Sequence, residues 1–254
     1  MTGQRKIHVC LSPLEELPQV DVWLVVDIIR ASSVVVAFFD EGGRVLVPVD
    51  SVGRARVVRE KMGSHWLLMG ERDAVPPEGF DLGNSPRDLL GGIPEEYAGA
   101  VMTTSNGTKA WIRAWKTGHP VLCAGARNAA AIERALDGGT NIGILCAGRK
   151  GRAAMDDTAC AGLLVSRILS KKKGIFTDDG AKIALALWET LEGDLGKGVR
   201  MASHMGILKK LGMEEDVEFC CKMDMSRIVP EMSEFKGYPA FFGGKKEDKK
   251  WGGA

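Results

Sequence analysis

The feature of this sequence that most restricts its fold is a regular alternation between short apolar runs and longer segments with helical periodicity. The apolar runs, many of them rich in β-branched residues, are Val22–Val26, Val45–Val49, Trp66–Met69, Ala100–Met102, Val121–Ala124 and Ile142–Ala147. Between them, apolar residues recur three and four positions apart, which is the spacing of an amphipathic helix. Strands that are apolar on both faces and are joined by helices are typical of parallel sheets covered on both sides. The sequence therefore predicts an α/β fold, with a mostly parallel or mixed sheet and helices on both faces.

The helical segments can be placed from their periodicity and their first residues. We expect helices at Ala31–Phe39, Val52–Met62, Thr108–Lys116, Asn128–Leu136 and Thr158–Ser170. Ser51 and Asn128 are candidate N-caps, because their side chains can accept hydrogen bonds from the free N–H groups of a first helical turn.

The character of the chain changes after Lys171–Lys173. Beyond this point Asp179–Glu192 and Val199–Leu211 predict two more helices, and the strand-like runs stop. We therefore predict an α/β core over residues 1–170 and a mainly helical part over 171–240, a division that would allow two lobes. The charged, glycine-rich residues 241–254 are expected to form a mobile tail.

The composition restricts the class of partner. A chain of 254 residues can bury a core without disulfides or metals. Its 34 Lys and Arg nearly balance its 33 Asp and Glu, which favours neither nucleic acid nor a membrane surface as a partner. The 6 cysteines form no CxxC pair, and no segment has the shape of a signal peptide or the length of a membrane helix. We expect a cytoplasmic protein that binds a small anionic molecule, and a homo-oligomer is compatible with these features.

Polar and charged residues gather in the loops that follow the apolar runs. These loops contain Asp27 to Arg30, Glu71–Arg72 with the long stretch to Leu89, Thr103–Thr108, Cys146–Arg152 and Asp156–Asp157. Because ligands of parallel sheets bind beyond the carboxyl ends of the strands, we expect these loops to share one rim. Their carboxylates and arginines are the mixture that holds a divalent cation beside an oxyanion such as a phosphoryl group. The 4 histidines show no spacing typical of a zinc site.

Four stretches resemble the successive motifs of the 2-phosphosulfolactate phosphatase family. They are VVDIIRASSVVVAFFDEGGRVLVPV, GERDAVPPEGFDLGNSPRDL, TTSNGTKA and ILCAGRKGRAAMDDTACAG, in the family's order and at similar spacing over about Val25–Gly162. The resemblance implies an Mg²⁺-dependent phosphatase that removes phosphate from 2-phospho-3-sulfolactate in coenzyme M biosynthesis. The chain departs from the family pattern modestly: Ser32 and Ser33 stand where two threonines are usual, Ser105 is an extra residue, and Asp156–Asp157 replaces a Glu-Asp pair.

The residues and the resemblance together define a predicted site. The predicted catalytic residues are Asp27, Arg30, Glu71, Asp81, Arg152 and Asp157. Mg²⁺ would be held by some combination of Asp27, Glu71, Asp81 and Asp157, the last preferred over Asp156 only because of its match to the family. The predicted substrate-binding residues are Ser32, Ser33, Arg72, Asn84, Ser85, Thr103, Thr104, Asn106, Gly107, Thr108, Cys146 and Gly148. The hydroxyl-rich loop Thr103–Thr108 would donate hydrogen bonds to a phosphate or sulfonate at a helix N-terminus, although at least one of its hydroxyls is expected to cap that helix.

Two other mechanisms and one non-enzymatic function remain open at this point. Cys146 and Arg152 form a C-x5-R spacing, as in phosphatases that use a cysteine nucleophile, but neighbouring carboxylates would oppose formation of a thiolate. Asp27 could itself form a phosphoaspartate, although Ile29 stands where haloacid-dehalogenase-type phosphatases carry a second aspartate. A non-catalytic anion-binding protein is the third alternative, and the number of carboxylates in the loops argues against it.

Overall fold

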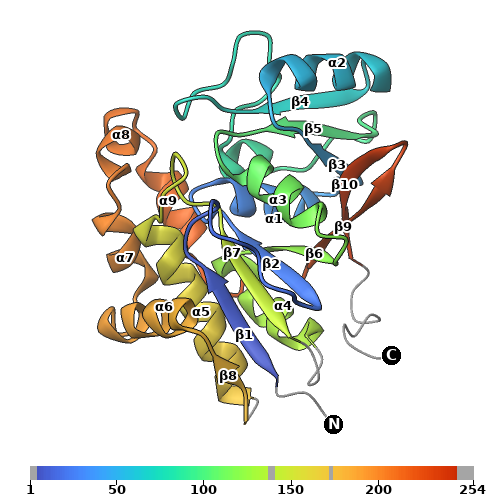
Figure 1. The fold of residues 1–254 in the computed structure, drawn as a ribbon. Helices are drawn as coiled ribbons and strands as arrows, with labels where there is room; N and C mark the ends of the chain where they lie inside the picture. The colour runs from blue at the N-terminus through green and yellow to red at the C-terminus, as the bar shows by residue number, and fades with distance from the viewer. Residues whose placement is uncertain (1–4, 137–140, 172–173, 245–254) are drawn as a thin grey trace.

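The computed structural model describes residues 5–136, 141–171 and 174–244, and it confirms an α/β fold with a mixed sheet (Figure 1). The strands of the 10-stranded sheet are β1 (Lys6–Cys10), β2 (Val22–Val26), β3 (Val45–Pro48), β4 (Trp66–Gly70), β5 (Gly99–Thr103), β6 (Val121–Ala124), β7 (Ile142–Cys146), β8 (Phe176–Thr177), β9 (Pro230–Phe235) and β10 (Tyr238–Gly243). The helices are α1 (Ala31–Asp40), α2 (Val52–Met62), α3 (Gly107–Trp115), α4 (Ala129–Ala135), α5 (Met155–Lys171), α6 (Asp179–Thr190), α7 (Leu195–Met201), α8 (Met205–Lys210) and α9 (Glu214–Cys221). Short 3₁₀ turns lie at Pro86–Leu89 and Ala126–Asn128.

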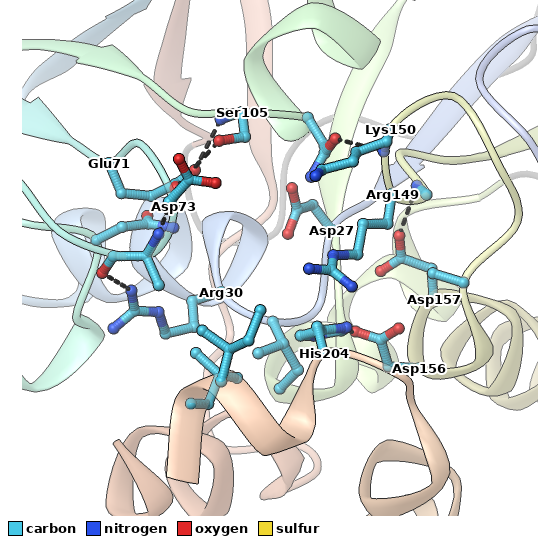
Figure 2. A pocket seen from close by; sticks show the side chains of 18 residues that line it. Asp27, Arg30, Glu71, Asp73, Ser105, Arg149, Lys150, Asp156, Asp157 and His204 are labelled. Carbon is cyan, nitrogen blue, oxygen red and sulfur yellow. Dashed lines mark hydrogen bonds and ion pairs between the residues drawn. The ribbon is translucent and has the colours of Figure 1, made fainter. Parts of the chain in front are cut away.

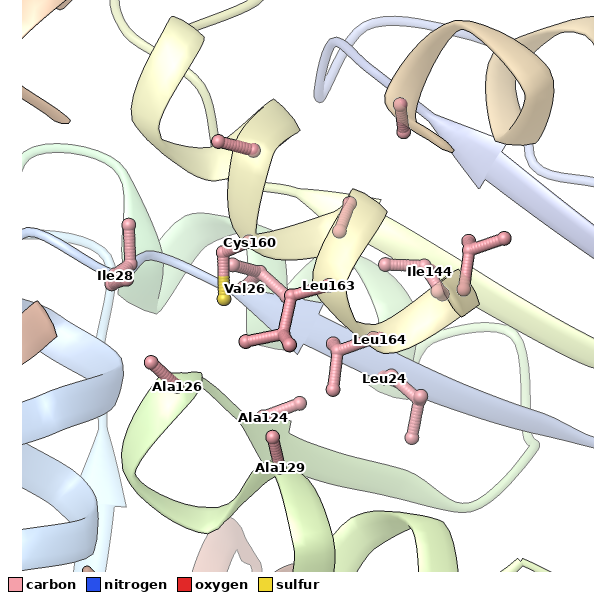
Figure 3. Packing of buried hydrophobic residues seen from close by; sticks show 14 of the residues in the cluster. Leu24, Val26, Ile28, Ala124, Ala126, Ala129, Ile144, Cys160, Leu163 and Leu164 are labelled. Atoms are coloured by element: carbon pink, nitrogen blue, oxygen red, sulfur yellow. The ribbon is translucent and has the colours of Figure 1, made fainter. Parts of the chain in front are cut away.

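Helices cover both faces of the sheet, as the apolar runs predict. Strand β2 is buried along its whole length, and its side chains alternate between two apolar clusters. Val22, Leu24 and Val26 pack with residues of α4 and α5 on one face, part of which is drawn in Figure 3. Trp23 and Val25 pack with residues of α1 and α3 on the other face. Successive side chains of a strand point to opposite faces of the sheet. Because every residue of β2 is apolar, the strand contributes to an apolar core on each face.

The sheet consists of two parallel groups joined by an antiparallel hairpin. Its order is β4-β5-β3-β10-β9-β6-β2-β7-β1-β8. Strands β4, β5 and β3 are parallel to one another, as are β6, β2, β7, β1 and β8. The β9–β10 hairpin pairs antiparallel with β3 on one side and with β6 on the other. Three antiparallel pairings in succession mean that the two parallel groups run in opposite senses along the sheet.

The twist of the sheet turns the carboxyl ends of the two groups toward each other. Neighbouring strands rotate by about 20–25°, so the five steps from β5 to β2 rotate the strand direction by about 100–125°. In Figure 1, β4 and β5 lie nearly horizontal, whereas β1 and β2 run diagonally. The loops after β2 and β5 accordingly meet: a Cβ added to Gly107, at the start of α3, would lie 2.7 Å from Oδ2 of Asp27.

The five helices predicted before Lys171 are confirmed, with shifts at the ends of most of them. Helix α2 has the predicted bounds, and its N-cap Ser51 accepts a hydrogen bond from the Arg54 amide at 3.3 Å. Asn128 precedes α4, but its Oδ1 accepts from the Gly125 amide and no side-chain bond caps the helix. Helix α5 begins at Met155 rather than at Thr158, which places Asp156 and Asp157 in its first turn, where the helix dipole favours acids.

The region after Lys171 differs most from the prediction. The predicted helix Val199–Leu211 is broken into α7 and α8, and the break brings His204 to the start of α8. The expectation that strands stop is wrong, because β8, β9 and β10 follow. Of the predicted tail, Phe241 is fully buried within β10, and residues 245–254 lie outside the described residues. The division of the chain at residues 170 and 240 stays a prediction.

The cysteines of the described chain are unpaired, and all but Cys221 are buried, as expected of thiols that act as small apolar side chains. Nowhere in the three described ranges does a helix combine the length and the apolar character needed to cross a membrane.

Candidate active site

A pocket of about 130 Å³ lies where the loops after β2, β4, β5 and β7 meet helix α8 (Figure 2). It has an acidic floor, a rim with two cations, and an apolar wall from α8. The residues that line it are Asp27, Ile29, Arg30, Glu71, Asp73, Ala74, Asn84, Ser105, Asn106, Gly148, Arg149, Lys150, Ala154, Asp156, Asp157, His204, Ile207 and Leu208. Seven of the predicted site residues are among them: Asp27, Arg30, Glu71, Asn84, Asn106, Gly148 and Asp157.

The loop after β2 places Asp27 at the centre of the pocket. The predicted substrate-binding residues Ser32 and Ser33 are buried beneath it and fix its backbone, rather than lining the pocket. Ser32 Oγ accepts a hydrogen bond from the Asp27 amide at 2.9 Å, and Ser33 Oγ donates to the Ile28 carbonyl at 3.1 Å. The Asp27 carboxylate accepts from the Ala31 amide at 3.3 Å, in the first turn of α1. The two hydroxyls therefore position the acid.

Three buried carboxyls of the pocket have raised pKa values. Burial, followed by the charges of Asp156 and Glu71, raises the pKa of Asp27 from 3.8 to about 7. Burial also raises the pKa of Asp156, which the charge of His204 opposes. The pKa of Asp157 is raised well above its usual value by burial and by the charges of Asp156 and Asp27. His204 and Arg149 offset the charge of Asp156 only in part, so a bound cation or proton would stabilise the carboxyls of the pocket floor.

The carboxylates differ in how much of their hydrogen-bonding capacity is already used. Asp157 accepts from the Ile28 amide at 2.9 Å and from the Gly148 amide at 2.8 Å. Glu71 accepts from the Ser105 amide at 2.7 Å, the Ser105 hydroxyl at 3.1 Å and the Ala74 amide at 3.0 Å. These two acids hold neighbouring loops together. Asp156, in contrast, has a buried Oδ1 for which the described part of the chain offers no hydrogen-bond partner.

The carboxylates that could hold a divalent cation are therefore Asp27 and Asp156, with Asp157 and Glu71 beside them. Across the described ranges, no three His, Cys, Asp or Glu side chains come close enough to form a metal-ligand cluster by themselves. Mg²⁺ needs no such cluster, because it typically binds one or two carboxylates and completes its shell with substrate oxygens and water. The buried, partnerless oxygen of Asp156 beside Asp27 fits that mode of binding.

Asp81, predicted as a metal ligand, does not line the pocket. Its Oδ2 accepts a hydrogen bond from the Leu68 amide at 2.7 Å and so fastens the long loop after β4 to that strand. From the same loop, Asn84 lines the pocket with a buried Oδ1 that has no partner. Ser85 lies behind the pocket and donates to Asp216 Oδ1 at 2.7 Å.

The three predicted arginines are engaged with protein groups or lie away from the pocket. Arg30 donates to Asp216 Oδ2 at 2.6 Å, and both side chains are buried. Arg72 lies outside the pocket lining and donates to the Glu71 carbonyl at 2.6 Å and to Thr103 Oγ1 at 2.9 Å. Arg152 pairs through its backbone with Arg149, and Arg149 is the one of the two that lines the pocket.

The hydroxyl-rich loop after β5 mainly stabilises its own turn. Thr104 Oγ1 accepts from the Thr108 amide at 3.1 Å, and Thr108 Oγ1 accepts from the Thr104 amide at 3.2 Å. Thr103, Thr104 and Thr108 are buried and do not line the pocket, nor does Gly107. Ser105 and Asn106 are the residues of the loop that reach it. One hydroxyl of the loop, that of Thr104, therefore accepts a hydrogen bond from an N–H of the first turn of α3, as expected, although the N-cap residue Asn106 makes no side-chain cap.

Cys146 is part of the core. It is fully buried at the end of β7 and packs in the apolar cluster with α5. Burial, and then the charges of Asp157 and Cys160, raise its pKa well above the usual value. A thiol in this environment is a poor nucleophile, and Arg152 does not face it across the pocket. The C-x5-R interpretation therefore has no geometric support.

Asp73, Arg149, Lys150 and His204 line the pocket but were not predicted as site residues; Asp156, which was ranked below Asp157, and Ser105 of the predicted anion-binding loop line it as well. Of these residues, His204 was the least expected. Its Nε2 lies 3.4 Å from Asp156 Oδ2 (Figure 2). Arg149 and Lys150 sit within a quoted motif and could have been considered with Arg152. His204 carries no comparable local signal, because it comes from the break between two helices far along the chain.

Comparison with known proteins supports one family. A profile for 2-phosphosulpholactate phosphatase matches residues 9–234. A protein of Deinococcus radiodurans is 38% identical over 240 residues, which cover 92% of this chain and 96% of the relative. A protein of Thermus thermophilus is 37% identical over 229 residues (89% and 93%), and one of Clostridium beijerinckii is 32% identical over 214 residues (84% and 89%). All three relatives carry the name probable 2-phosphosulfolactate phosphatase.

Proposed function

Since the chain belongs to the 2-phosphosulfolactate phosphatase family, we propose that it is an Mg²⁺-dependent phosphatase that hydrolyses 2-phospho-3-sulfolactate, or a close phosphorylated hydroxy acid, to the hydroxy acid and phosphate. The observation that carries this proposal is the pocket itself. Buried carboxylates that include Asp27 and Asp156 line the same small pocket as the cations Arg149 and Lys150. This arrangement suits a cation and a multiply charged oxyanion bound together.

Asp27 and Asp156 would hold the Mg²⁺, with Asp157 and Glu71 supporting the loops around them. A bound divalent cation supplies polarisation of a phosphoryl oxygen and lowers the pKa of a water molecule. The chain's own residues would orient the ester: Ser105 and Asn106 line the pocket at the N-terminal end of α3, beside Glu71 and the turn that carries Lys150. Ile207 and Leu208 of α8 cover one side and limit access of bulk water.

His204 is the residue best placed to return a proton to the leaving alcohol. Its imidazole lines the pocket and lies against Asp156, which can orient it. The P–O bond to the hydroxy acid breaks, the departing oxygen receives a proton from His204, and the attacking water loses one to a pocket carboxylate. This assignment would account for a histidine that the C-terminal helices bring 3.4 Å from a buried acid.

The test is phosphate release from purified protein. The substrates are 2-phospho-3-sulfolactate, 2-phospholactate and glycerol 2-phosphate, each assayed with Mg²⁺ and with excess chelator. We expect turnover of the first substrate with Mg²⁺, its loss in chelator and its recovery when Mg²⁺ is restored. Asp81→Asn provides the matched acid outside the pocket, and it should keep its metal requirement and most of its activity. Full activity in chelator would overturn the metal-dependent mechanism. Phosphate binding without release from any ester would instead favour the non-catalytic alternative.

A further inference from the structure

Residues Arg149 to Arg152 form a tight turn at the edge of the pocket. The Arg149 amide donates to the Arg152 carbonyl at 2.8 Å, and the Arg152 amide donates back to the Arg149 carbonyl at 3.0 Å. The two central residues, Lys150 and Gly151, have φ of 50° and 78°. Positive φ at both central positions is characteristic of a type I′ turn. Glycine adopts it readily, but lysine does so at a cost, and such strain is often found at functional sites.

The turn is fixed from three sides. Asn106 Oδ1, at the start of α3, accepts a hydrogen bond from the Lys150 amide at 3.2 Å. Asp157 Oδ2 accepts from the Gly148 amide at 2.8 Å, and Ser12 Oγ donates to the Gly151 carbonyl at 2.9 Å. A Cβ added to Gly148 would lie 2.2 Å from the Arg152 carbonyl oxygen, so the chain approaches itself here more closely than any other residue type allows. The turn is therefore organised before any ligand binds.

Two cationic side chains of this turn, Arg149 and Lys150, line the pocket. Neither Arg149 nor Lys150 takes part in any of the salt bridges that the described residues form. Arg30, the other arginine of the pocket, is committed to Asp216 at 2.6 Å. In Figure 2, Arg149 extends toward the middle of the pocket near Asp27 and His204, and Lys150 lies above it on the side of Ser105. The turn therefore presents two positive charges to whatever enters.

We propose that the Arg149–Lys150 turn binds an anionic group of the substrate other than the phosphoryl group, and thereby selects phosphoesters that carry a carboxylate or sulfonate near the ester carbon. This inference rests on the proposed function and deepens it. If Asp27 and Asp156 hold a divalent cation, that cation would meet the charge of the phosphoryl group. The remaining anions of the substrate need their own partners, and Arg and Lys donors on a backbone-fixed turn, which form no salt bridge with a described residue, provide charge-assisted hydrogen bonds.

The experiment compares Arg149→Gln and Lys150→Asn with the wild-type protein on three esters. These are 2-phospho-3-sulfolactate, with a carboxylate and a sulfonate, 2-phospholactate, with a carboxylate alone, and glycerol 2-phosphate, with neither. Gln retains much of the arginine side chain's length, and Asn tolerates the positive φ of residue 150, so each change removes a charge and leaves the turn intact. Lys109→Gln is the matched control, because Lys109 is an exposed lysine on α3 that does not line the pocket.

We expect each variant to lower kcat/KM for 2-phospho-3-sulfolactate about ten- to a hundredfold, mainly through KM, and to change kcat/KM for glycerol 2-phosphate less than about threefold. A loss on 2-phospholactate would assign the turn to the carboxylate, and no loss there would assign it to the sulfonate. Equal losses on all three esters would place these side chains on the phosphoryl group and overturn the proposal, as would no loss on any ester.

A binding measurement separates this inference from the proposed function. Calorimetric titration with 3-sulfolactate, which has both anions and no phosphate, requires no turnover. Arg149→Gln and Lys150→Asn should weaken this binding by a similar factor, whereas Lys109→Gln should leave it unchanged. If the wild-type protein binds 3-sulfolactate through the turn but hydrolyses none of the esters, the phosphatase proposal fails and the anion site stands. If binding is the same in all variants, the anion site fails whatever the activity.

Discussion

Replacement of Asp27 by asparagine is expected to stabilise the metal-free protein while it destroys activity. The folded chain raises the pKa of Asp27 from 3.8 to about 7, first by burial and then through Asp156 and Glu71. An acid whose pKa is higher in the folded state binds its proton more tightly there, so folding loses stability as pH rises from about 4 to about 7. One pKa unit corresponds to about 1.4 kcal/mol, so ionised Asp27 lowers the free energy of unfolding at about pH 8 by about 4 kcal/mol.

Asparagine resembles the protonated acid and removes this penalty. It can still accept the hydrogen bond from the Ala31 amide, but its NH₂ group adds buried donors, which cost about 1–3 kcal/mol if they find no partner. Asp27→Asn should therefore raise the free energy of unfolding by about 1–3 kcal/mol at about pH 8 in chelator. The gain should vanish or reverse at about pH 4, where wild-type Asp27 is already largely protonated.

The assay is urea unfolding of both proteins at several pH values, with and without Mg²⁺, together with phosphate release. Wild-type protein should gain stability from Mg²⁺ at about pH 8 and the variant should gain little, because a ligand of the cation is lost. Turnover should fall by a factor on the order of a hundred or more. A variant that is less stable than wild type across the whole pH range would refute the charge argument. Normal turnover in the variant would move the catalytic centre away from Asp27.

Three further outcomes follow from the contacts around the pocket. Cys146→Ser should reduce kcat/KM only a few-fold in steady-state assays, because the thiol is buried in the core with a raised pKa, and a trapped cysteinyl phosphate would contradict this. His204→Gln should lower kcat by about ten- to a thousandfold with little change in inhibition by phosphate, and an unchanged pH–rate profile would exclude it as the proton donor. Asp216→Asn should lower the free energy of unfolding by about 3–5 kcal/mol in urea titrations, since it leaves Arg30 buried without its charged partner, and a neutral effect would show that the pair is hydrated.

The fold could be predicted where its signal is local. Strands β2 to β7 are apolar nearly throughout, and the helices between them carry their own periodicity, so both were found without knowledge of the tertiary structure. The hairpin β9–β10 was missed because β9 mixes Pro, Glu and Ser with only two large apolar residues, and the apolar run of β10, Ala240–Phe242, is short and follows a proline. The two strands are held in the sheet by pairing with their neighbours, β10 with β3 and β9 with β6. A sheet position filled by the last part of the chain leaves no periodic signal in that segment.

The same distinction applies to the pocket. Asp27, Glu71 and Asp157 were predicted because a carboxylate at the end of an apolar strand, or at the start of the next helix, is visible in the sequence itself. The roles of the arginines were not visible, because Arg30 is paired with Asp216, 186 residues away. His204 likewise contacts Asp156 across a gap in the sequence, since residues 156 and 204 are 48 positions apart. These contacts depend on how α7, α8 and α9 pack across the carboxyl ends of the strands, which single-sequence patterns do not encode.

The turn at Arg149–Arg152 is a second case in which tertiary contacts, rather than the local sequence, determine which side chain lines the pocket. Its two arginines flank the same Lys-Gly pair and hydrogen-bond to each other through their backbones. The sequence alone therefore does not indicate which of the two lines the pocket. The contacts of Asn106, Asp157 and Ser12 decide which one faces the pocket. The selected arginine then stands near buried acids whose pKa values are raised, and its charge, after that of His204, opposes the effect of burial on Asp156. A cation on the acids and an anion on the turn would satisfy both sets of charges together, so each should strengthen binding of the other.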